Sequence, residues 1–571
     1  MRQWMVAAKK ADFYAIAEKF HVDPVVARII RNREVIGEKN IRIYLGGNLS
    51  DLSDPHQMKD MDRLVEILAQ KIRKQVHIRI IGDYDVDGVT SSHLFLTALR
   101  RVGAKVDVVI PHRIQDGYGL SLHLLQQAKE DGVDTILTCD NGIAAIDEIA
   151  WAKAQKMTVL VTDHHAVPFE EHEGRRTEKK SLADAVVNPH QQDCRYPYKE
   201  LCGAGVAWNV IRVLYENYDM DKREAEDLLD FVAMATVCDV MSLTGENRIL
   251  VKEGLKRIRH TKNIGLQALM QACNVQPENI SAYHFGYVLG PCVNATGRLD
   301  TARHALRLFE TGQETEAEEI ARDLVDLNQE RKELTLQGVE MAKKLCEEGG
   351  YEKDPVLVLF LPDVHESIAG LIAGRIREMY NRPVFVLTRG EEGVKGSGRS
   401  TENYSMYENM CGCAELFTKF GGHPMAAGLS LPTENIDLFR AKLNRQQTLT
   451  EKELTPVTWI DVPMPVSYAS KKLVEQLRVL EPFGKGNEKP VFADRKLTVR
   501  SANMIGKNKN VLKMQLEDTQ GHVVDAIQFK VEEEDMPLRG KEISIVYYPD
   551  INEFRGNQTL QFIVQEWCYT T

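Results

Sequence analysis

Hydrophobic and polar positions change their spacing several times along this chain of 571 residues. Between Val76 and about Val187, short β-branched runs alternate with amphipathic stretches. This alternation is typical of parallel strands joined by crossover helices, so it predicts an α/β domain built on a parallel sheet. The expected strands are Ile78–Ile81, Val106–Ile110, Thr135–Thr138, Thr158–Val161 and Ala185–Val187, with helices near Ser91–Arg101, Leu122–Asp131 and Ala144–Gln155 between them.

The rest of the chain divides into a helical part, a second α/β part and a β-rich part. Helical spacing dominates from Gly203 to Lys344, and its last section predicts a long helix that connects two lobes. After Pro456, short alternating strands predict a small β-barrel of the OB type. The smaller α/β domain between them is expected from strands at Pro355–Phe360 and Pro383–Leu387, a helix near Ile368–Tyr380 and glycine-rich turns at Gly396–Gly398 and Gly421–Gly422.

A chain of this length is too long for one hydrophobic core, so we expect several folding units. The functional site can therefore lie between domains. The expected segments are an N-terminal segment at 1–55, the first α/β domain at 56–301, a connecting helix at 302–345, the second α/β domain at 346–450 and the barrel at 456–571.

Composition and charge narrow the class of protein. Hydrophobic residues make up 43% of the chain and charged residues 27%, which excludes a disordered or fibrous protein. The formal net charge of −11 argues weakly against a nucleic-acid binder, because phosphate binding depends on Lys and Arg. A locally basic groove can still accompany a carboxylate-rich metal site, so the total charge does not decide the matter.

The ten cysteines are scattered, and no pair of C-x-x-C motifs offers a zinc site. The N-terminal residues, interrupted by Arg2, Lys9, Lys10 and Asp12, lack the apolar core of a signal peptide. No later segment is apolar for membrane-spanning length. We expect a cytoplasmic protein with reduced thiols and no membrane contact.

Three polar clusters each follow an expected strand of the first domain. They are Asp83–Gly88, Asp140–Gly142 and Asp163–His165. Because the carboxyl ends of parallel strands meet at one crevice, these groups are expected to form one site. Several carboxylates in one crevice repel one another and lose hydration, and bound divalent cations remove that penalty. Asp oxygens with His nitrogens favour Mn²⁺ or Mg²⁺, and two ions about 3.5–4 Å apart can promote hydrolysis of phosphate esters.

Each cluster also has a simpler interpretation. Asp83–Gly88 matches the first half of an EF-hand loop, but position twelve is Leu94 rather than Glu, and a strand precedes the loop where an EF-hand has a helix. Asp163–His165 alone would be a turn with solvent-facing histidines. Asp140–Gly142 alone would be an ordinary turn, because Asp, Asn and Gly are common turn residues. Only their shared position at strand ends favours catalysis.

The same three clusters resemble successive motifs of the DHH phosphoesterases, in order and in spacing. Further segments extend the resemblance over nearly the whole chain to the RecJ family, the single-strand-specific DNA exonucleases of that superfamily. These segments are Pro111–Arg113, Asp116–Gly119, Gly203–Ala207, Cys238–Val240, Asn294–Arg298, His365, Arg375, Gly396–Ser400, Gly421–His423, Ala426–Gly428 and Leu480–Asn487.

The resemblance implies roles for individual residues of the site. Asp140 is a candidate bridge between the two ions, and His165 would polarise the scissile phosphate, with Asp83 and Asp163 as further catalytic residues. Ile81 stands where many relatives with small substrates carry a histidine ligand, so that ligand is either missing or supplied by Asp83. The metal ligands implied are Asp85, Asp87, Asp140, His164 and Asp239.

Basic and glycine-rich positions are the candidates for contacts with nucleic acid. Arg113, Arg298 and Arg399 are expected in loops on DNA phosphates, although a single arginine is more often a solvated surface group. Gly421 and Gly422, followed by His423, would let backbone N–H groups approach a terminal phosphate, although a plain tight turn is the alternative. The resemblance adds Arg375 and Ser397. Barrel aromatics that could either stack on bases or fill the core are Phe529, Tyr547, Tyr548 and Phe554.

By this resemblance the chain is expected to be a 5′→3′ exonuclease on single-stranded DNA that releases mononucleotides in DNA repair and recombination. A RecQ-type helicase and a single-strand-binding protein are the partners it implies. Three alternatives stay open: a phosphodiesterase for cyclic dinucleotides or very short RNA, an inactive scaffold, and a binding module that depends on the barrel alone. Residues after Pro456 count against the first, and the retained acidic motifs count against the second.

Overall fold

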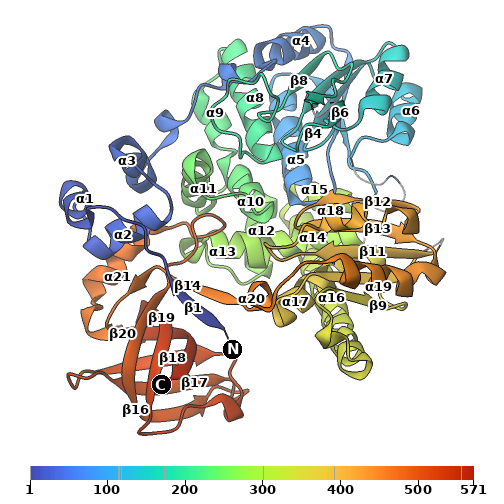
Figure 1. Ribbon diagram of the computed structural model, residues 1–571. Helices are drawn as coiled ribbons and strands as arrows, with labels where there is room; N and C mark the ends of the chain where they lie inside the picture. Colours follow the sequence, from blue (N-terminus) through green and yellow to red (C-terminus); the bar gives the residue numbers. More distant parts are fainter. Residues whose placement is uncertain are drawn as a thin grey trace.

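The computed structural model describes residues 2–112, 116, 119–172, 175–299, 301–390, 393–554 and 556–570. In the first domain, the expected parallel sheet is confirmed, with strand order β3-β2-β4-β5-β8. Figure 1 shows this domain at the top of the molecule. Its strands are β2 (His77–Ile81), β3 (Lys105–Val109), β4 (Thr135–Cys139), β5 (Thr158–Thr162) and β8 (Ala185–Val187).

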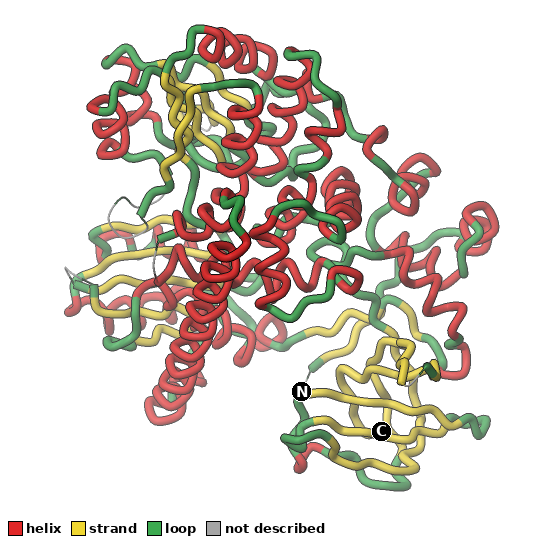
Figure 2. The backbone as a smooth tube through the Cα atoms, turned by 180° about the vertical axis from the view of Figure 1, so that it is seen from behind, coloured by secondary structure: helices red, strands yellow, loops and turns green. Residues whose placement is uncertain are grey.

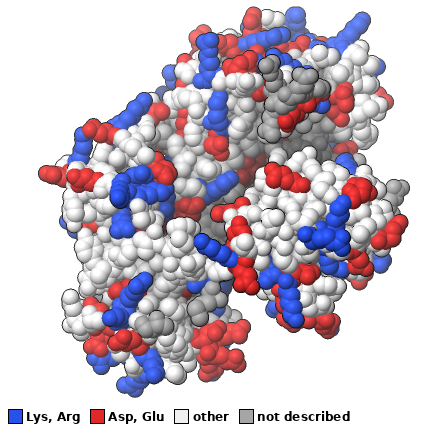
Figure 3. Space-filling model, viewed as in Figure 1, with Lys and Arg blue, Asp and Glu red and all other residues white. Residues whose placement is uncertain are grey.

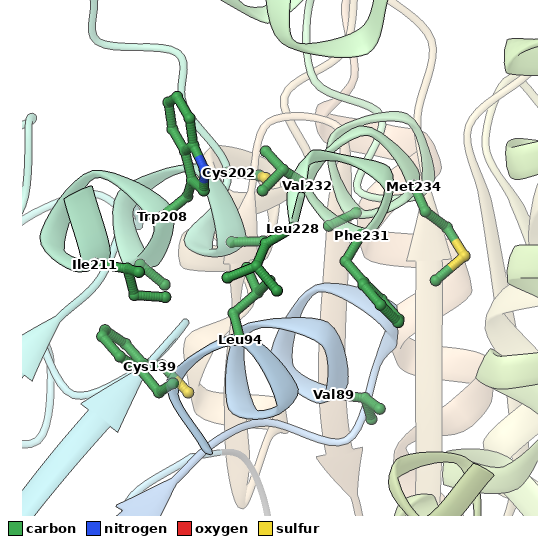
Figure 4. Packing of buried hydrophobic residues seen from close by; sticks show 14 of the residues in the cluster. Val89, Leu94, Cys139, Cys202, Trp208, Ile211, Leu228, Phe231, Val232 and Met234 are labelled. Carbon is green, nitrogen blue, oxygen red and sulfur yellow. The ribbon is translucent and has the colours of Figure 1, made fainter. Parts of the chain in front are cut away.

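Two hydrophobic clusters cover the two faces of this sheet. One face packs on α4 (Met61–Arg73), α5 (Val86–Arg101) and α8 (Gly203–Asn217), and the other packs on α6 (Leu122–Glu130) and α7 (Ile146–Ala154). Both faces of the inner strands β2, β4 and β5 are buried, which explains their continuous apolar runs in the sequence. In Figure 4, side chains of α5, α8 and α10 (Leu229–Cys238) meet between these helices, among them Leu94, Trp208 and Phe231.

The connecting segment differs from the single helix expected at 302–345. It consists of α15 (Ala302–Glu310) and the longer α16 (Glu314–Gly349). The chain bends at Thr311–Gln313, where the Thr311 side chain accepts a hydrogen bond from the Gln313 N–H. Thr and Gly favour such local turns over helix, so the helical spacing concealed a corner. The long α16 projects downward past the second α/β domain in Figure 2.

The second α/β domain holds a sheet of order β12-β13-β11-β10-β9. Helix α17 (Glu366–Tyr380) packs on one face, and α18 (Met406–Cys411) and α19 (Ile436–Gln446) belong to the core on the other. The glycine-rich turns expected here are wrong, because Gly396–Gly398 and Gly421–Gly422 lie inside strands. The strands are β9 (Leu357–Phe360), β10 (Val384–Arg389), β11 (Val394–Arg399), β12 (Lys419–His423) and β13 (Ala426–Leu431).

The glycines of β11 have a packing reason. A Cβ on Gly398 would lie 2.6 Å from Met406 Sδ and 2.8 Å from the Phe385 ring, so no larger residue fits there without displacing the core. Glycine inside a strand commonly marks such a close approach. A turn and a tightly packed strand have the same composition at this point, and only the packing separates them.

The C-terminal part forms the expected barrel, in which β16 pairs with both β17 and β19 to close the sheet. Of the aromatic candidates, Tyr547 and Tyr548 lie in its core, Phe529 is exposed, and the Phe554 side chain lies outside the described residues. The strands are β15 (Val462–Pro463), β16 (Phe492–Ile505), β17 (Val511–Glu517), β18 (Val523–Phe529), β19 (Glu542–Phe554) and β20 (Asn557–Tyr569).

The N-terminal segment packs on this barrel, far from it in sequence. Strand β1 (Gln3–Val6) pairs in parallel with β14 (Val457–Ile460). Residues of α2 (Pro24–Asn32) and α3 (Glu38–Gly46) share one buried cluster with the barrel strands. Figure 1 shows the blue N-terminal helices beside the red barrel. No helix among the described residues combines the length and the apolar composition that crossing a membrane requires.

Candidate metal centre

The polar clusters at the ends of β2, β4 and β5 converge on one point. Single ligand atoms of Asp83, Asp85 and Asp140 lie within 4.8 Å of one another, and the same holds for Asp87, His164 and Asp239. A third group joins Asp140 to His164 and His165. The structure therefore brings all the sequence-predicted acidic and histidine residues of the first domain into one site, with Asp140 and His164 shared between groups.

The start of α5 holds two of these carboxylates, Asp85 and Asp87. Asp85 is its N-cap residue and accepts a hydrogen bond from the Gly88 N–H at 3.0 Å, so the helix begins earlier than its apolar spacing indicated. Asp87 is buried, and its carboxylate accepts hydrogen bonds from the N–H groups of Gly203 and Ala204 at 2.6 and 2.7 Å. Those donors form the N-terminus of α8, whose dipole also favours a negative charge.

Asp140 has an unusual backbone conformation directly after β4. Its φ of 61° lies in the left-handed region, which Asp tolerates better than most residues. A Cβ on Gly203 would lie 2.6 Å from Asp140 Cβ, so glycine is needed where α8 passes this residue. Backbone strain held by close packing is common at functional sites.

His164 stands among three carboxylates. Its Nε2 atom lies 3.1 Å from Asp140 Oδ1 and 3.7 Å from Oδ2 of both Asp87 and Asp239. Burial lowers the pKa of His164, which favours the neutral imidazole. Asp239 reaches the site from the C-terminal end of α10. An imidazole nitrogen and three carboxylates around one point form a donor set for a divalent cation.

The electrostatics of the site also fit cations. Burial and the charges of neighbouring carboxylates raise the pKa of Asp83, Asp85 and Asp140, and raise that of Asp239 to about 8. Asp83 Oδ1 is buried with no hydrogen-bond partner in the described part of the chain. Such groups are costly to leave unpaired, and two divalent ions would satisfy them. Ile81, a buried residue of β2, offers no ligand atom. Because Asp83 lies with Asp85 and Asp140, its carboxylate can supply the missing metal ligand.

Asp163 and His165 form a separate unit beside the carboxylates. Asp163 Oδ1 accepts hydrogen bonds from the N–H groups of His164 and His165 and from His165 Nδ1, and its Oδ2 accepts one from the Ile143 N–H. Although burial alone lowers the pKa of His165, the hydrogen bond and charge of Asp163 raise it to about 9. The His165 side chain is 41% exposed. Asp163 thus orients His165 toward solvent as a charged donor.

Three of the arginine candidates for nucleic-acid contacts lie outside the second sheet. Arg298 lies at the end of helix α14 (Gly290–Leu299), not in the expected loop, and donates to the Ser367 carbonyl of α17 at 2.6 Å. Arg375 lies farther along α17, where its exposed side chain pairs with Glu378, and no described contact joins it to Arg298. Arg113 is outside the described residues.

The remaining candidates share one face of the second sheet. In the middle strand β13, Ala426 pairs with Arg399 of β11 on one side and with His423 of β12 on the other. In the same way, Gly428 pairs with Ser397 and with Gly421. Since paired residues of neighbouring strands point to the same face, Ser397, Arg399 and His423 project from one side. Gly422 points to the other side, and with φ of 155° its Cβ would lie 2.5 Å from the Ala426 carbonyl.

This face adjoins α17 and hence Arg298. A Cβ on Gly370 of α17 would lie 2.9 Å from Arg399 Nη2 and 3.5 Å from Ser397 Cβ. The surface in Figure 3 is hollowed between the first domain above and the second domain at the right. Arg298, Ser397 and Arg399 therefore lie around α17, where the first and second domains meet.

Some supporting residues were not recognised from the sequence as parts of the site. The N–H groups at the start of α8 bind Asp87, and Asn294 Oδ1 accepts a hydrogen bond from the Val86 N–H at the start of α5. The segments Gly203–Ala207 and Asn294–Arg298 carried the resemblance, but their spacing showed no contact with α5. Backbone donors leave no pattern of side chains, so only the tertiary structure reveals them.

Comparisons with known proteins agree with this architecture. Residues 77–236 match the model of the DHH family, N-terminal domain, residues 353–448 match the DHHA1 domain, and residues 460–566 match the RecJ OB domain. The single-stranded-DNA-specific exonuclease RecJ of Haemophilus influenzae is 35% identical over 563 residues, covering 95% of both chains. The protein of that name from Escherichia coli is 33% identical over 565 residues, also covering 95% of both chains.

A solved structure shows the same fold throughout. The crystal structure of RecJ in complex with Mn²⁺ from Thermus thermophilus aligns over 100% of this chain and 80% of that chain, with a TM-score of 0.83 and 26% sequence identity. The corresponding complex with Mg²⁺ gives a TM-score of 0.78, with 25% identity and coverage of 100% and 79%.

The carboxylate and histidine site at the ends of a parallel sheet, together with a DHHA1 domain, defines a metal-dependent phosphoesterase of the DHH class. On identity over nearly the full length, the chain belongs to the RecJ family.

Proposed function

We propose that the chain is an exonuclease specific for single-stranded DNA that hydrolyses phosphodiester bonds with two divalent ions. The observation that carries this proposal is the convergence of Asp83, Asp85, Asp87, Asp140, His164 and Asp239 in overlapping groups of ligand atoms. The names of the full-length relatives support the substrate, and the titles of the solved structures support Mn²⁺ or Mg²⁺.

The groups suggest how two ions would be held. Asp83, Asp85 and Asp140 would hold one ion, and Asp87, His164 and Asp239 the other, with Asp140 close enough to His164 to bridge them. When bound, such ions activate water and stabilise charge at the phosphorus. His165, oriented by Asp163, would donate from Nε2 to a phosphate oxygen, which its raised pKa favours.

The contacts proposed for the DNA strand lie between the lobes. Arg298 and Arg399 would bind phosphates, with Ser397, Gly421 and His423 along the same sheet face. The resemblance alone proposes three further contacts, at Arg113, Arg375 and Gly422. Arg113 is outside the described residues, Arg375 pairs with Glu378 farther along α17, and a Cβ on Gly422 would lie on the opposite face of the sheet from Ser397 and Arg399. We also propose 5′→3′ polarity, mononucleotide products and a role in DNA repair and recombination, on the family resemblance alone.

The proposal also covers the barrel, the partner proteins and the cellular compartment. An OB domain commonly adds affinity for single strands through basic and aromatic residues, and Phe529 is an exposed candidate. A single-strand nuclease needs unwound DNA, so a RecQ-type helicase and a single-strand-binding protein are proposed partners. The cytoplasm is the proposed compartment, because all ten cysteines are free thiols.

Digestion of labelled oligonucleotides tests this function. With Mn²⁺ or Mg²⁺, the chain should degrade single strands labelled at the 3′ end to mononucleotides and leave blunt duplexes intact. Excess chelator should abolish the activity, and higher salt should weaken it because phosphate contacts release counterions. Asp140→Asn should lower kcat by at least about a thousandfold while the fold persists. Equal activity of this variant and the parent, or full activity in chelator, would exclude the proposed site.

A further inference from the structure

Two exposed tyrosines lie side by side on a helical segment that no expected role includes. Tyr283 and Tyr287 are 61% and 70% exposed, with ring centroids 5.1 Å apart and an interplanar angle of 24°. Tyr283 belongs to α13 (Ala282–His284) and Tyr287 to the π-helical turn Phe285–Leu289 that continues it. Their spacing of four residues places them on one face of the segment. Together they present two stacked aromatic rings to solvent.

This segment is fixed to the helix that carries Asp239. The Cys238 thiol donates a hydrogen bond to the Phe285 carbonyl at 3.3 Å. A Cβ on Gly290 would lie 2.3 Å from Cys238 Sγ, so the end of the π-helical turn packs directly on the last turn of α10. Cys238 precedes the proposed ligand Asp239. Single π-helical turns are rare and occur often at functional sites. The segment that carries the tyrosine pair is therefore fixed against Cys238, the residue that precedes Asp239.

A loop that carries a basic residue packs on the segment after α10 from another part of the chain. The loop Glu481–Asn487, which precedes the barrel, packs on the segment after Asp239, where the Leu243 N–H donates to the Lys485 carbonyl at 2.8 Å. The Lys485 side chain is exposed. The loop is held in place by Asn487, a buried residue whose side chain donates to the carbonyls of Leu480 and Pro482.

We propose that Tyr283 and Tyr287 form a stacking platform for bases of the single strand next to the metal centre, with Lys485 on a neighbouring phosphate. Stacking on aromatic rings accepts any base, because every base has a π-face. Bases inside a duplex are paired and stacked on one another, so they cannot turn onto such a surface. The platform rests on the proposed nuclease function and adds to it a source of preference for single strands.

Steady-state kinetics on single-stranded oligonucleotides test the platform. The double variant Tyr283→Ala/Tyr287→Ala should raise KM on the order of tenfold for each stacked base, with little change in kcat. Tyr283→Phe/Tyr287→Phe should retain the parent KM, because the rings remain. Tyr14→Ala, which removes a tyrosine that is 78% exposed on α1 (Phe13–Phe20), is the matched control and should change nothing. Unchanged melting temperatures would show that the exposed substitutions leave the fold intact.

Oligonucleotides with a single abasic nucleotide separate stacking from other effects. At one or two positions near the degraded end, loss of the base should raise the KM of the parent but not that of the Ala double variant, because the lost contact is already absent. Equal losses in both proteins at every position would overturn the proposal, as would an unchanged KM in the double variant. A parent chain without nuclease activity on single strands would instead refute the proposed function, so the two failures are distinct.

Lys485 has its own measurement. Lys485→Gln should lower the dependence of log KM on log salt by roughly one phosphate contact. Lys472 lies in α21 (Lys471–Leu477), the short helix that precedes this loop. Lys472→Gln should leave the dependence of log KM on log salt unchanged. Equal slopes for the parent and Lys485→Gln would show that Lys485 contacts no phosphate of the strand.

Discussion

Two carboxylates at opposite ends of α10, Asp230 and Asp239, differ in what surrounds them. Asp239 lies among the other carboxylates of the metal centre. Asp230, near the start of the helix, is not part of that centre, and its side chain accepts hydrogen bonds from the Thr261 hydroxyl at 2.6 Å and from the Phe231 N–H at 2.9 Å. Burial raises the pKa of Asp230 to about 6. The same residue type is thus a proposed cation ligand at one end of the helix and a buried, hydrogen-bonded carboxyl at the other.

Asp230→Asn should therefore stabilise the protein at alkaline pH. Because the folded-state pKa is raised above the unfolded value, the ionised carboxyl costs stability above about pH 6, and the penalty disappears below the unfolded pKa near 4. The expected gain is about 3 kcal/mol at pH 8, from the shift of roughly two pKa units. Denaturant unfolding of parent and variant at pH 8 and pH 4.5 measures it. A gain that is equal at both pH values would assign the effect to packing instead.

At the scale of elements, the site depends on close contact between helices and strand ends. The start of α8 supplies two N–H groups to Asp87, and it passes Asp140 so closely that only glycine fits at position 203. Helix α5 contributes Asp85 as its own cap. The carboxylates are thus positioned by helix termini, whose dipoles partly offset the repulsion between them.

Gly203→Ala tests this arrangement. Its Cβ would meet Asp140 Cβ at 2.6 Å, so either α8 or Asp140 must move. A displacement of about 1 Å in a catalytic group can cost roughly a hundredfold in rate, and we expect a loss of kcat of that order. Gly205→Ala, in the same helix, has its nearest neighbour at an ordinary 3.4 Å and should keep full activity. Comparable kcat values for both variants would show that Asp140 tolerates the added methyl group.

At the scale of the whole molecule, a buried arginine joins three distant parts of the chain. Arg248 of α11 (Gly245–Ile258) is 1% exposed, and its guanidinium donates to the carbonyls of Tyr44, Val479 and Leu480. These acceptors belong to the N-terminal helices and to the segment before the barrel. Arg248 thus links the first domain to the N-terminal part and the barrel, and so helps fix the loop that carries Lys485.

Replacing Arg248 by Met should loosen this junction. The variant loses three hydrogen bonds from a charged donor and leaves buried carbonyls unpaired, for an expected cost of about 3–5 kcal/mol. Calorimetry should show the barrel and the N-terminal segment melting at a lower temperature, with faster proteolysis near residues 450–456. Arg223→Met, at a side chain that is 83% exposed, is the control. Identical melting and proteolysis of Arg248→Met and the parent would contradict a structural role for this contact.

Much of the architecture followed from local patterns. Apolar runs bounded by helical spacing predicted the parallel sheet, and alternating positions after Pro456 predicted the barrel, because such periods reflect which faces are buried. Patterns failed where two structures share a composition: the glycines of β11 and β12 looked like turns, and α15 and α16 looked like one helix. The pairing of β1 with β14 was missed because it joins segments hundreds of residues apart.

The sequence by itself determined the chemical groups of the site and their place at strand ends, since residue type and the position of a residue directly after a strand are local properties. Only the tertiary structure decided which atoms meet: that Asp83 lies with Asp85 and Asp140, that Asp163 orients His165, and that Arg298 reaches across to α17. The reason is physical. Distances of a few ångströms between carboxylates depend on how separate helices pack, and packing is a property of the whole chain.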